Sequence, residues 1–256
     1  MDHRSVLTVL LLFQGLTQVS MAEDKQVEKD ISTRILEANK RMSHLLMEGD
    51  VALPKTRNAM KCFTRRCKWP KSTSGLVEIP FKIEPVYKSF ALRTIQDAMN
   101  AFHTQTCIRF VPYAGQTNYL IIQSNGGCWS DIGMQRGAQY VSIDISGCIS
   151  EGVIQHELLH ALGFYHEHTR SDRDKYVTIN FQNIDRDNYK NFDKQDTNNL
   201  DTPYDYSSVM HYGRRAFAQG KDSIIPIPDA SVPIGQRQGM SRIDIQRINK
   251  LYECRG

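Results

Sequence analysis

The 256-residue sequence lacks several features that would place it in other protein classes. It has no Asn-x-Ser/Thr triplet, so N-glycosylation is not expected. It has no internal repeat, no low-complexity tract and no additional modules, which argues against a structural matrix protein. Beyond the first residues, no apolar run is long enough to cross about 30 Å of hydrocarbon. The net charge of +4 is small, and we expect neither nucleic acid nor membrane as a partner.

Cysteine is absent from the first 61 residues and then occurs six times. The spacing of these cysteines does not match that of a zinc ribbon. An even number of cysteines in an exported chain indicates disulfides, although the sequence alone leaves their pairing open. Cys62 and Cys67 are close enough to close a small loop with each other. The other four are Cys107, Cys128, Cys148 and Cys254.

Residues 1–22 are typical of a secretory signal peptide, because Arg4 precedes an apolar run and Ser20 and Ala22 are small residues at alternative cleavage points. The apolar run is too short for a membrane anchor. We therefore expect a secreted, extracellular protein, with storage in secretory granules beforehand as an option.

Residues 23–57 are charged, favour a helix and end in a loop-like stretch. Lys55 and Arg57 in that stretch offer a trypsin-like protease a cut after Arg57. We interpret residues 23–57 as a propeptide and residues 58–256 as the mature domain. The alternative is an ordinary N-terminal helix followed by a basic loop.

The remainder of the chain has the pattern of one compact α+β domain. Helical spacing of apolar residues predicts an amphipathic helix that ends near Thr104. Ser241 and Asp244 are placed as the capping box of a helix near the end of the chain. Strands are expected at 107–113, 118–124 and 139–146, a helix at 152–162, and a long polar region at 171–206.

The stretch QHELLHALGFYHEHTR contains four of the eight histidines in the chain. On a helix, His156 and His160 are one turn apart and share a face. Gly163 accepts the left-handed conformation that ends helices, so the chain can turn back and bring His166 to the same point. Three neutral imidazoles around an open position suit zinc. His168 falls outside this spacing and is expected at the surface.

Glu157, beside His156, is placed to act as a base on a water at the open position. It can accept the proton of that water and later pass it to a leaving amine, which predicts amide hydrolysis. Met210, in SSVMHYG, is expected to form an apolar floor under the metal, and Tyr212 to bring a phenol near it. The alternative for the whole stretch is a core helix with satisfied histidines.

The stretches HELLHALGFYHEHTRSDRD and SVMHYG resemble the extended zinc motif HExxHxxGFxHExxRxDRD and the Met-turn of the astacin family of zinc endopeptidases, which are metzincins. PYDYSSVMHYG, IGQR and LYEC are also similar, and the resemblance covers about Leu76 to Cys254. It implies a two-lobed α+β domain with an active-site helix, a mixed sheet and one Zn²⁺ at the floor of a long cleft.

By this resemblance, three histidines bind the zinc, Glu157 is the catalytic base, and Tyr212 is a fifth, movable ligand that stabilises the oxyanion. The zinc ligands are His156, His160 and His166. The implied disulfides are Cys107–Cys254 and Cys128–Cys148.

Astacin propeptides carry an F-x-G-D segment, which is matched here by the four residues 47–50, MEGD. The resemblance implies that Asp50 blocks the zinc in place of water and keeps the precursor latent. In the family, the residue matching Glu167 contacts the new N-terminus after activation. Arg237 in IGQR is interpreted either as favouring acidic substrate side chains or as a surface ion-pair residue.

The Cys62–Cys67 pair, NAMKC and a sequence that stops two residues after Cys254 resemble the short astacins of the fish hatching-enzyme type. This implies a monomeric protease whose partners are protein substrates, namely egg-envelope glycoproteins, and an activating protease that cuts after Arg57. Two alternatives remain: a short astacin of another tissue, of the nephrosin type, or a non-catalytic secreted binding protein on the same scaffold. Retention of Glu157 and all three histidines favours the enzyme.

Overall fold

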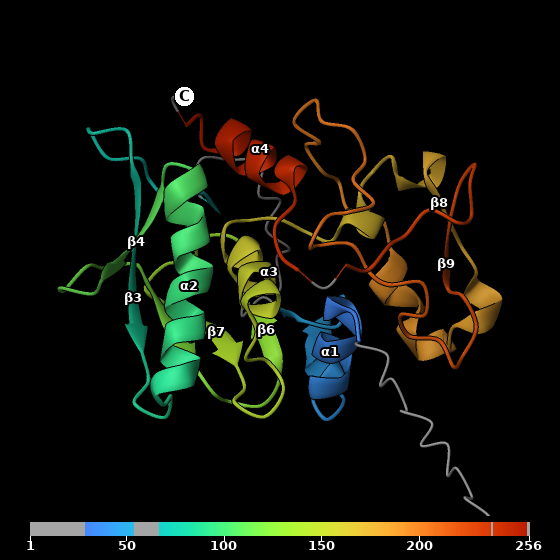
Figure 1. Ribbon diagram of the computed structural model, residues 1–256, viewed down its shortest axis with the longest axis horizontal. Coiled ribbons are helices and arrows are strands. Elements are labelled where there is room, and N and C mark those ends of the chain that lie inside the picture. Colours follow the sequence, from blue (N-terminus) through green and yellow to red (C-terminus); the bar gives the residue numbers. More distant parts are fainter. Residues whose placement is uncertain (1–28, 54–66, 237, 255–256) are drawn as a thin grey trace, which may run out of the picture.

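The structure is a computed structural model that describes residues 29–53, 67–236 and 238–254. The predicted signal peptide, the predicted cut after Arg57, and the residues Cys62 and Arg237 lie outside these ranges. The described residues form two lobes, with the short helix α1 (Ile31–Ala38) between them (Figure 1). None of the described helices combines the length and apolar character needed to cross a bilayer.

The first lobe is built on a mixed sheet with the strand order β1-β2-β6-β7-β5-β3-β4. Strands β3, β4, β5 and β7 are parallel, whereas β6 is antiparallel to β7. The predicted propeptide adds the hairpin β1–β2 to the sheet, because β2 pairs in parallel with β6. The bounds are β1 Leu46–Met47, β2 Val51–Ala52, β3 Val77–Ile83, β4 Ile108–Pro112, β5 Tyr119–Gln123, β6 Cys128–Ser130 and β7 Ala138–Ile143.

Two helices, α2 (Ser89–Gln105) and α3 (Glu151–Ala161), pack against each other and against this sheet. The apolar residues of α2 from Ile95 to Phe102 recur at helical spacing and face the core, which confirms the predicted amphipathic helix. Helix α3 is buried on every side from Gly152 onward, so it runs through the centre of the molecule. A last helix, α4 (Arg242–Leu251), begins at the predicted capping box.

The second lobe contains little regular structure. Its strands β8 (Val177–Ile179) and β9 (Ile224–Pro226) pair antiparallel, and a small core of aromatic and aliphatic side chains fills the space behind them. The long polar region predicted from the sequence folds as a series of 3₁₀ turns around this core. These turns are η4 Arg173–Lys175, η5 Phe181–Asn183 and η6 Arg186–Phe192. Two further 3₁₀ turns lie outside this region: η3 Glu167–Thr169 comes directly before it, and η1 Ser43–Leu45 precedes β1.

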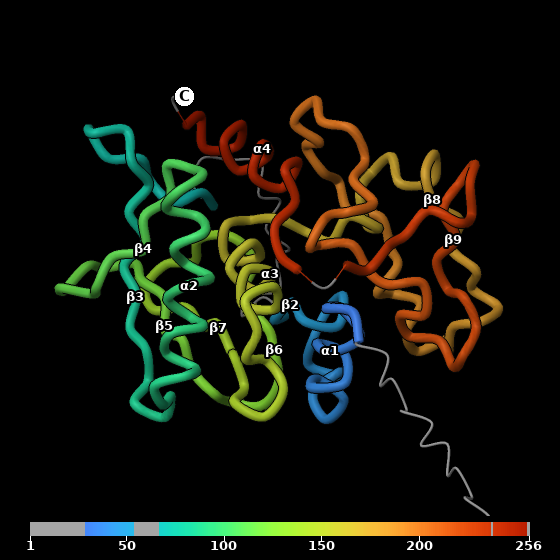
Figure 2. Tube along the Cα trace, viewed as in Figure 1, coloured from blue at the N-terminus to red at the C-terminus, as the bar shows by residue number. Residues whose placement is uncertain are grey.

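Helix α1 lies beside α3 and β6, as Figure 2 shows. Its N-cap residue, Asp30, accepts a hydrogen bond from the Thr33 amide. A Cβ on Gly152 would lie 2.5 Å from Ile31 Cδ1, and a Cβ on Gly213 would lie 2.6 Å from an oxygen of Asp30. This helix therefore fits between the lobes because both positions are glycine.

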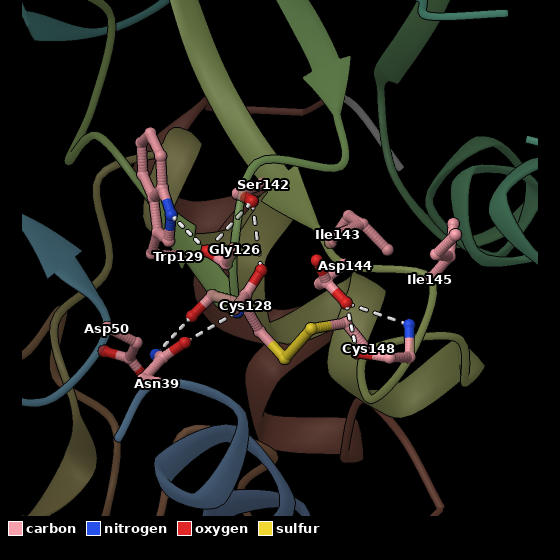
Figure 3. Close-up of a disulfide and its surroundings, with 12 residues drawn as sticks. Asn39, Asp50, Gly126, Cys128, Trp129, Ser142, Ile143, Asp144, Ile145 and Cys148 are labelled. Carbon is pink, nitrogen blue, oxygen red and sulfur yellow. Dashed lines mark hydrogen bonds between the residues drawn. A yellow bond between two sulfur atoms is a disulfide. The ribbon is translucent and has the colours of Figure 1, made fainter. Parts of the chain in front are cut away.

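Two disulfides fix the first lobe. Cys107, directly before β4, is bonded to Cys254 after α4. Cys128 in β6 is bonded to Cys148 (Figure 3). Cys67 is buried and bonded to no described cysteine; because Cys62 lies outside the described residues, the Cys62–Cys67 bond stays a prediction.

Candidate metal centre

The end of α3 and the turn that follows it bring three histidines together. His156 and His160 lie on one face of α3, which ends at Ala161, and the chain leaves the helix as predicted through Gly163, whose φ of 100° is left-handed. The Gly163 amide donates to the His160 carbonyl at 2.8 Å, and the chain then turns back to place His166 beside the other two. The Nε2 atoms of His160 and His166 each lie 3.2 Å from Nε2 of His156.

The hydrogen bonds on the far side of each ring decide where the protons are. Nδ1 of His156 donates to the Val209 carbonyl at 2.9 Å, and Nδ1 of His160 donates to the Phe164 carbonyl at 2.7 Å. A carbonyl oxygen only accepts, so each of these two rings carries a proton on Nδ1, and in the neutral ring Nε2 keeps the lone pair that a metal binds. Four donors at about 2.0–2.1 Å from a tetrahedral zinc lie about 3.3 Å apart, which fits the observed spacing. The three rings therefore fit a zinc ion held between them.

A carboxylate from the predicted propeptide supplies a fourth donor. Asp50 Oδ2 lies 3.1 Å from His156 Nε2 and 3.2 Å from His166 Nε2, and Oδ1 lies 3.3 Å from His160 Nε2. All four ligand atoms lie within 4.8 Å of one another and are buried. Burial alone would raise the pKa of Asp50, but the imidazoles of His166 and His160 hold it well below its usual value. The resulting donor set of three nitrogens and one ionised oxygen suits one Zn²⁺.

Glu48, which no sequence pattern singled out, completes the surroundings of His166. It is fully buried, and its carboxylate accepts from His166 Nδ1 at 2.7 Å and from Gln195 Nε2 at 2.7 Å. Its main-chain carbonyl accepts from the phenol of Tyr212. Burial, with the charges of Asp50 and Glu48, raises the pKa of Tyr212 well above its usual value, so this phenol remains a donor.

Glu157 lies on α3 directly after His156 and is fully buried. Neither of its carboxylate oxygens has a hydrogen-bond partner among the described residues. Burial and the negative charge of Asp50 raise the pKa of Glu157 well above its usual value. A buried carboxyl in this position beside a metal cluster is free to exchange a proton, which is the property expected of a catalytic base.

Met210 is buried in the turn that follows Val209, and its carbonyl accepts from the Glu167 amide at 3.0 Å. The prediction that His168 is a surface residue is wrong. Its ring is fully buried and stacks on Tyr212 at 4.0 Å, and its Nε2 donates to the Asn191 carbonyl at 3.1 Å. The chain after the zinc motif enters the second lobe instead of following the surface, and it carries this histidine inside.

Glu167 is buried but has several partners. Two guanidinium groups contact its carboxylate, one from Arg247 at 2.8 Å and one from Arg170 at 3.2 Å, and the Asp205 amide donates to it at 2.7 Å. Burial raises the pKa of Glu167, although these arginines oppose that change. Asn58, the start of the predicted mature domain, lies outside the described residues, so the contact between Glu167 and a new N-terminus stays a prediction.

Comparison with known proteins agrees with this geometry. The profile of the peptidase family described as Astacin matches residues 64–253. The chain belongs to the astacin family. It is therefore a zinc metalloendopeptidase that acts on protein substrates, and the predicted α+β astacin fold is confirmed.

Two astacins of the medaka fish, Oryzias latipes, are similar to this chain along most of their length. High choriolytic enzyme 1 is 55% identical over an alignment of 228 positions, which covers 88% of this chain and 84% of the relative. Low choriolytic enzyme is 48% identical over an alignment of 264 positions, which covers 98% of this chain and 97% of the relative. The solved structure of high choriolytic enzyme 1, described as a hatching enzyme zinc-protease, has a TM-score of 0.74 at 56% identity and covers 77% of this chain and all of that chain.

Proposed function

We propose that the chain is made as a secreted, latent precursor and that its mature form digests the glycoproteins of the egg envelope at hatching. In this proposal residues 1–22 are the signal peptide, residues 23–57 the propeptide and residues 58–256 the protease. The relatives named as choriolytic enzymes support the substrate. The observation that supports latency is the contact between the carboxylate of Asp50 and the Nε2 atoms of the three histidines. A short astacin of another tissue remains the alternative.

Zinc, when bound by His156, His160 and His166, supplies Lewis acidity that polarises a peptide carbonyl and acidifies water. Glu157 accepts the proton of the attacking water and returns it to the amine that leaves, since no other described residue holds its carboxylate. In the latent precursor the phenol of Tyr212 donates to the Glu48 carbonyl. Once the propeptide has left, the same phenol donates to the substrate oxygen that becomes negative during the attack.

The hydrogen bonds from the far sides of the histidine rings hold the metal-binding nitrogens in place. Those to the Val209 and Phe164 carbonyls are made within the mature domain, so they persist after the propeptide leaves. The bond from His166 to Glu48 is made to the propeptide and is lost on activation.

The experiment that tests the substrate uses the full chain after limited trypsin treatment, on casein and on isolated egg envelope. We expect both to be cleaved, activity to be lost with phenanthroline, and zinc to restore it. Casein cleavage with an intact envelope would retain the peptidase and overturn the hatching role. Zinc binding without cleavage of any protein would favour the non-catalytic alternative.

Latency is tested in an uncleavable precursor that carries Arg57→Ala. Adding Asp50→Ala should raise its activity on a short peptide by about 100-fold, since a charged contact worth about 3 kcal/mol corresponds to about two factors of ten. Glu37→Ala, which removes only an exposed ion pair with Lys29, is the matched control and should change nothing. Equal activity of the Asp50→Ala and Glu37→Ala precursors would overturn the assignment of Asp50, and zinc content is measured alongside.

A further inference from the structure

Asn39 follows α1 in the predicted propeptide and is almost completely buried, with 1% of its surface exposed. Its carboxamide makes three hydrogen bonds, two of which join it to Cys128 (Figure 3). Nδ2 donates to the carbonyls of Cys128 at 2.6 Å and Gly49 at 2.8 Å, and Oδ1 accepts from the Cys128 amide at 2.7 Å. Both the donor and the acceptor of this side chain are therefore engaged with β6.

The exchange with Cys128 has the form of a strand pairing. In an antiparallel pair, one residue donates its N–H to the facing residue of the other strand and accepts a hydrogen bond from that residue's N–H at its own C=O. The Asn39 carboxamide exchanges the same two hydrogen bonds with Cys128. Two residues further along β6, the Ser130 amide donates to the main-chain carbonyl of Asp50 at 3.0 Å. The propeptide thus occupies the outer edge of β6 at two successive positions, once with a side chain and once with main chain.

The protease side of this contact is held by bonds that do not involve the propeptide. Cys128 is bonded to Cys148 (Figure 3), and the Ser142 hydroxyl donates to the Gly127 carbonyl at 3.0 Å. Gly127 has a φ of 71°, and a Cβ there would overlap Oδ1 of Asn39. Because β6 is held in this way, Asn39 docks on an existing edge and does not create it.

We propose that Asn39 is a second latency residue, which closes the β6 edge by imitating a peptide group and acts separately from Asp50 at the metal. This rests on the proposed function, in which residues 23–57 are the propeptide. Asp50 competes for the metal position, whereas Asn39 competes for main-chain donors and acceptors of the protease. An extended peptide chain pairs with the free groups of a strand edge, so removal of Asn39 would open that edge.

The test uses the full chain with Glu157→Gln, which prevents self-digestion, and follows amide hydrogen exchange at β6. With Asn39→Ala we expect the Cys128 amide to exchange at least about tenfold faster, because it loses a buried acceptor. The Ser130 amide, held by Asp50, should exchange within about threefold of its original rate. Lys40→Ala, at the exposed neighbouring position, is the matched control and should leave both unchanged.

Asn39→Asp separates the two directions of the bond. The carboxylate still accepts from the Cys128 amide but gives nothing to the carbonyls of Cys128 and Gly49, so the propeptide should also bind more weakly. In the trypsin-cut chain with native Glu157, dilution lets the cut propeptide dissociate, and protease activity then appears. For both Asn39 variants we expect activity to appear at a concentration about 10- to 100-fold higher than for the unsubstituted chain. This shift corresponds to the loss of two or three buried hydrogen bonds between the propeptide and the protease. Zinc content should not change.

An unchanged exchange rate of the Cys128 amide in Asn39→Ala would overturn the proposal. Equally faster exchange of the Cys128 and Ser130 amides would also overturn it, because Asn39 would then only support α1. Failure of the proposed function is recognised separately. A mature chain that cleaves no protein would overturn the protease role while the exchange result at β6 stands, because exchange is measured without activity.

Discussion

Two buried glutamates, ten residues apart in the same segment, have opposite surroundings. Glu157 on α3 has no hydrogen-bond partner for either oxygen in the described part of the chain. Glu167, just past the third histidine, is held by Arg247, Arg170 and the Asp205 amide. Each glutamate directly follows a zinc-motif histidine, yet one carboxylate is left free beside the metal donors and the other joins the zinc motif to α4.

This difference separates chemistry from architecture. A buried carboxylate without a partner costs stability, so its retention is explained by a reaction that needs it. A buried carboxylate between arginines contributes through its contacts, and removing it leaves uncompensated positive charge. Substitution should therefore affect activity at one position and folding at the other.

The largest effect is expected for Glu157→Gln in the mature protein. Loss of the proton acceptor should lower kcat/KM by about 10³- to 10⁴-fold on a peptide substrate. Zinc content should stay the same, and the free energy of unfolding should not fall, since glutamine removes an unpaired buried charge. Glu151→Gln, at the exposed first turn of α3, is the control and should keep activity within about twofold. Substantial unfolding of the Glu157 variant would contradict the comparison.

Glu167→Ala should mainly affect folding. Breaking a buried pair with Arg247 lowers the free energy of unfolding by about 3–5 kcal/mol, which for a chain of this size lowers the thermal midpoint by about 10 °C. Asp172→Ala removes the more exposed partner of Arg170 and should cost less than about 1 kcal/mol. If the Glu167 variant unfolds normally but loses kcat, this carboxylate has a chemical role and the distinction between the two glutamates fails.

The pH dependence of stability should contain a contribution from His211. Burial lowers its pKa to about 4, although a hydrogen bond to the Tyr212 carbonyl and the charge of Asp205 oppose this. Its ring donates to that carbonyl and accepts from the Tyr204 phenol at 2.8 Å, a pair of bonds that only the neutral form makes. The folded pKa lies below the usual 6.5, so its contribution is present above pH 6.5 and is lost as pH falls from 6.5 to 4.

By pH 4 this loss should reach about 3 kcal/mol. Chemical denaturation at a series of pH values measures it. His211→Gln should lower the free energy of unfolding at about pH 7, but this free energy should then fall less on acidification than that of the native chain. The difference between the two pH curves separates the contribution of His211 from that of the zinc histidines. Parallel curves for the two proteins would show that His211 does not titrate as expected. Exposed His44→Gln serves as the control.

The smallest effect is expected for Met210→Leu. The turn contacts Glu167 through the Met210 carbonyl, which the substitution keeps. A volume-conserving change of this kind costs less than about 1.5 kcal/mol in unfolding free energy, and kcat/KM should stay within about threefold. Met99→Leu in the core of the first lobe provides the comparison. A larger loss of zinc affinity in Met210→Leu alone would show that the thioether itself matters to the metal.

The parts of the site that lie close together in the chain could be predicted from the sequence. His156, His160 and His166 follow from helical spacing and a glycine, and the capping box at Ser241 follows from local rules. Strand β6 was not predicted, because its three residues after a pair of glycines carry no alternating pattern. The polar region after residue 170 also gave no indication that it would fold around aromatic side chains.

The contacts that join distant segments could not be predicted. Glu48 meets His166 across 118 positions, and Asn39 meets Cys128 across 89. A glutamate in a turn and an asparagine after a helix are usually solvated or bonded locally, so nothing in their neighbours indicates burial. The family resemblance identified Asp50, but it was silent on both of these residues.

The close fit of α1 between the lobes has an evolutionary consequence. Side chains larger than hydrogen at Gly152 and Gly213 would collide with Ile31 and Asp30 of the predicted propeptide. Because the proposed propeptide is removed on maturation, a mutation at either glycine has to meet two requirements. The mature protease has to remain active, and the precursor has to keep room for α1 of the propeptide. Laboratory evolution of the isolated mature domain would be released from the second requirement, and its winners could fail when returned to the full-length gene.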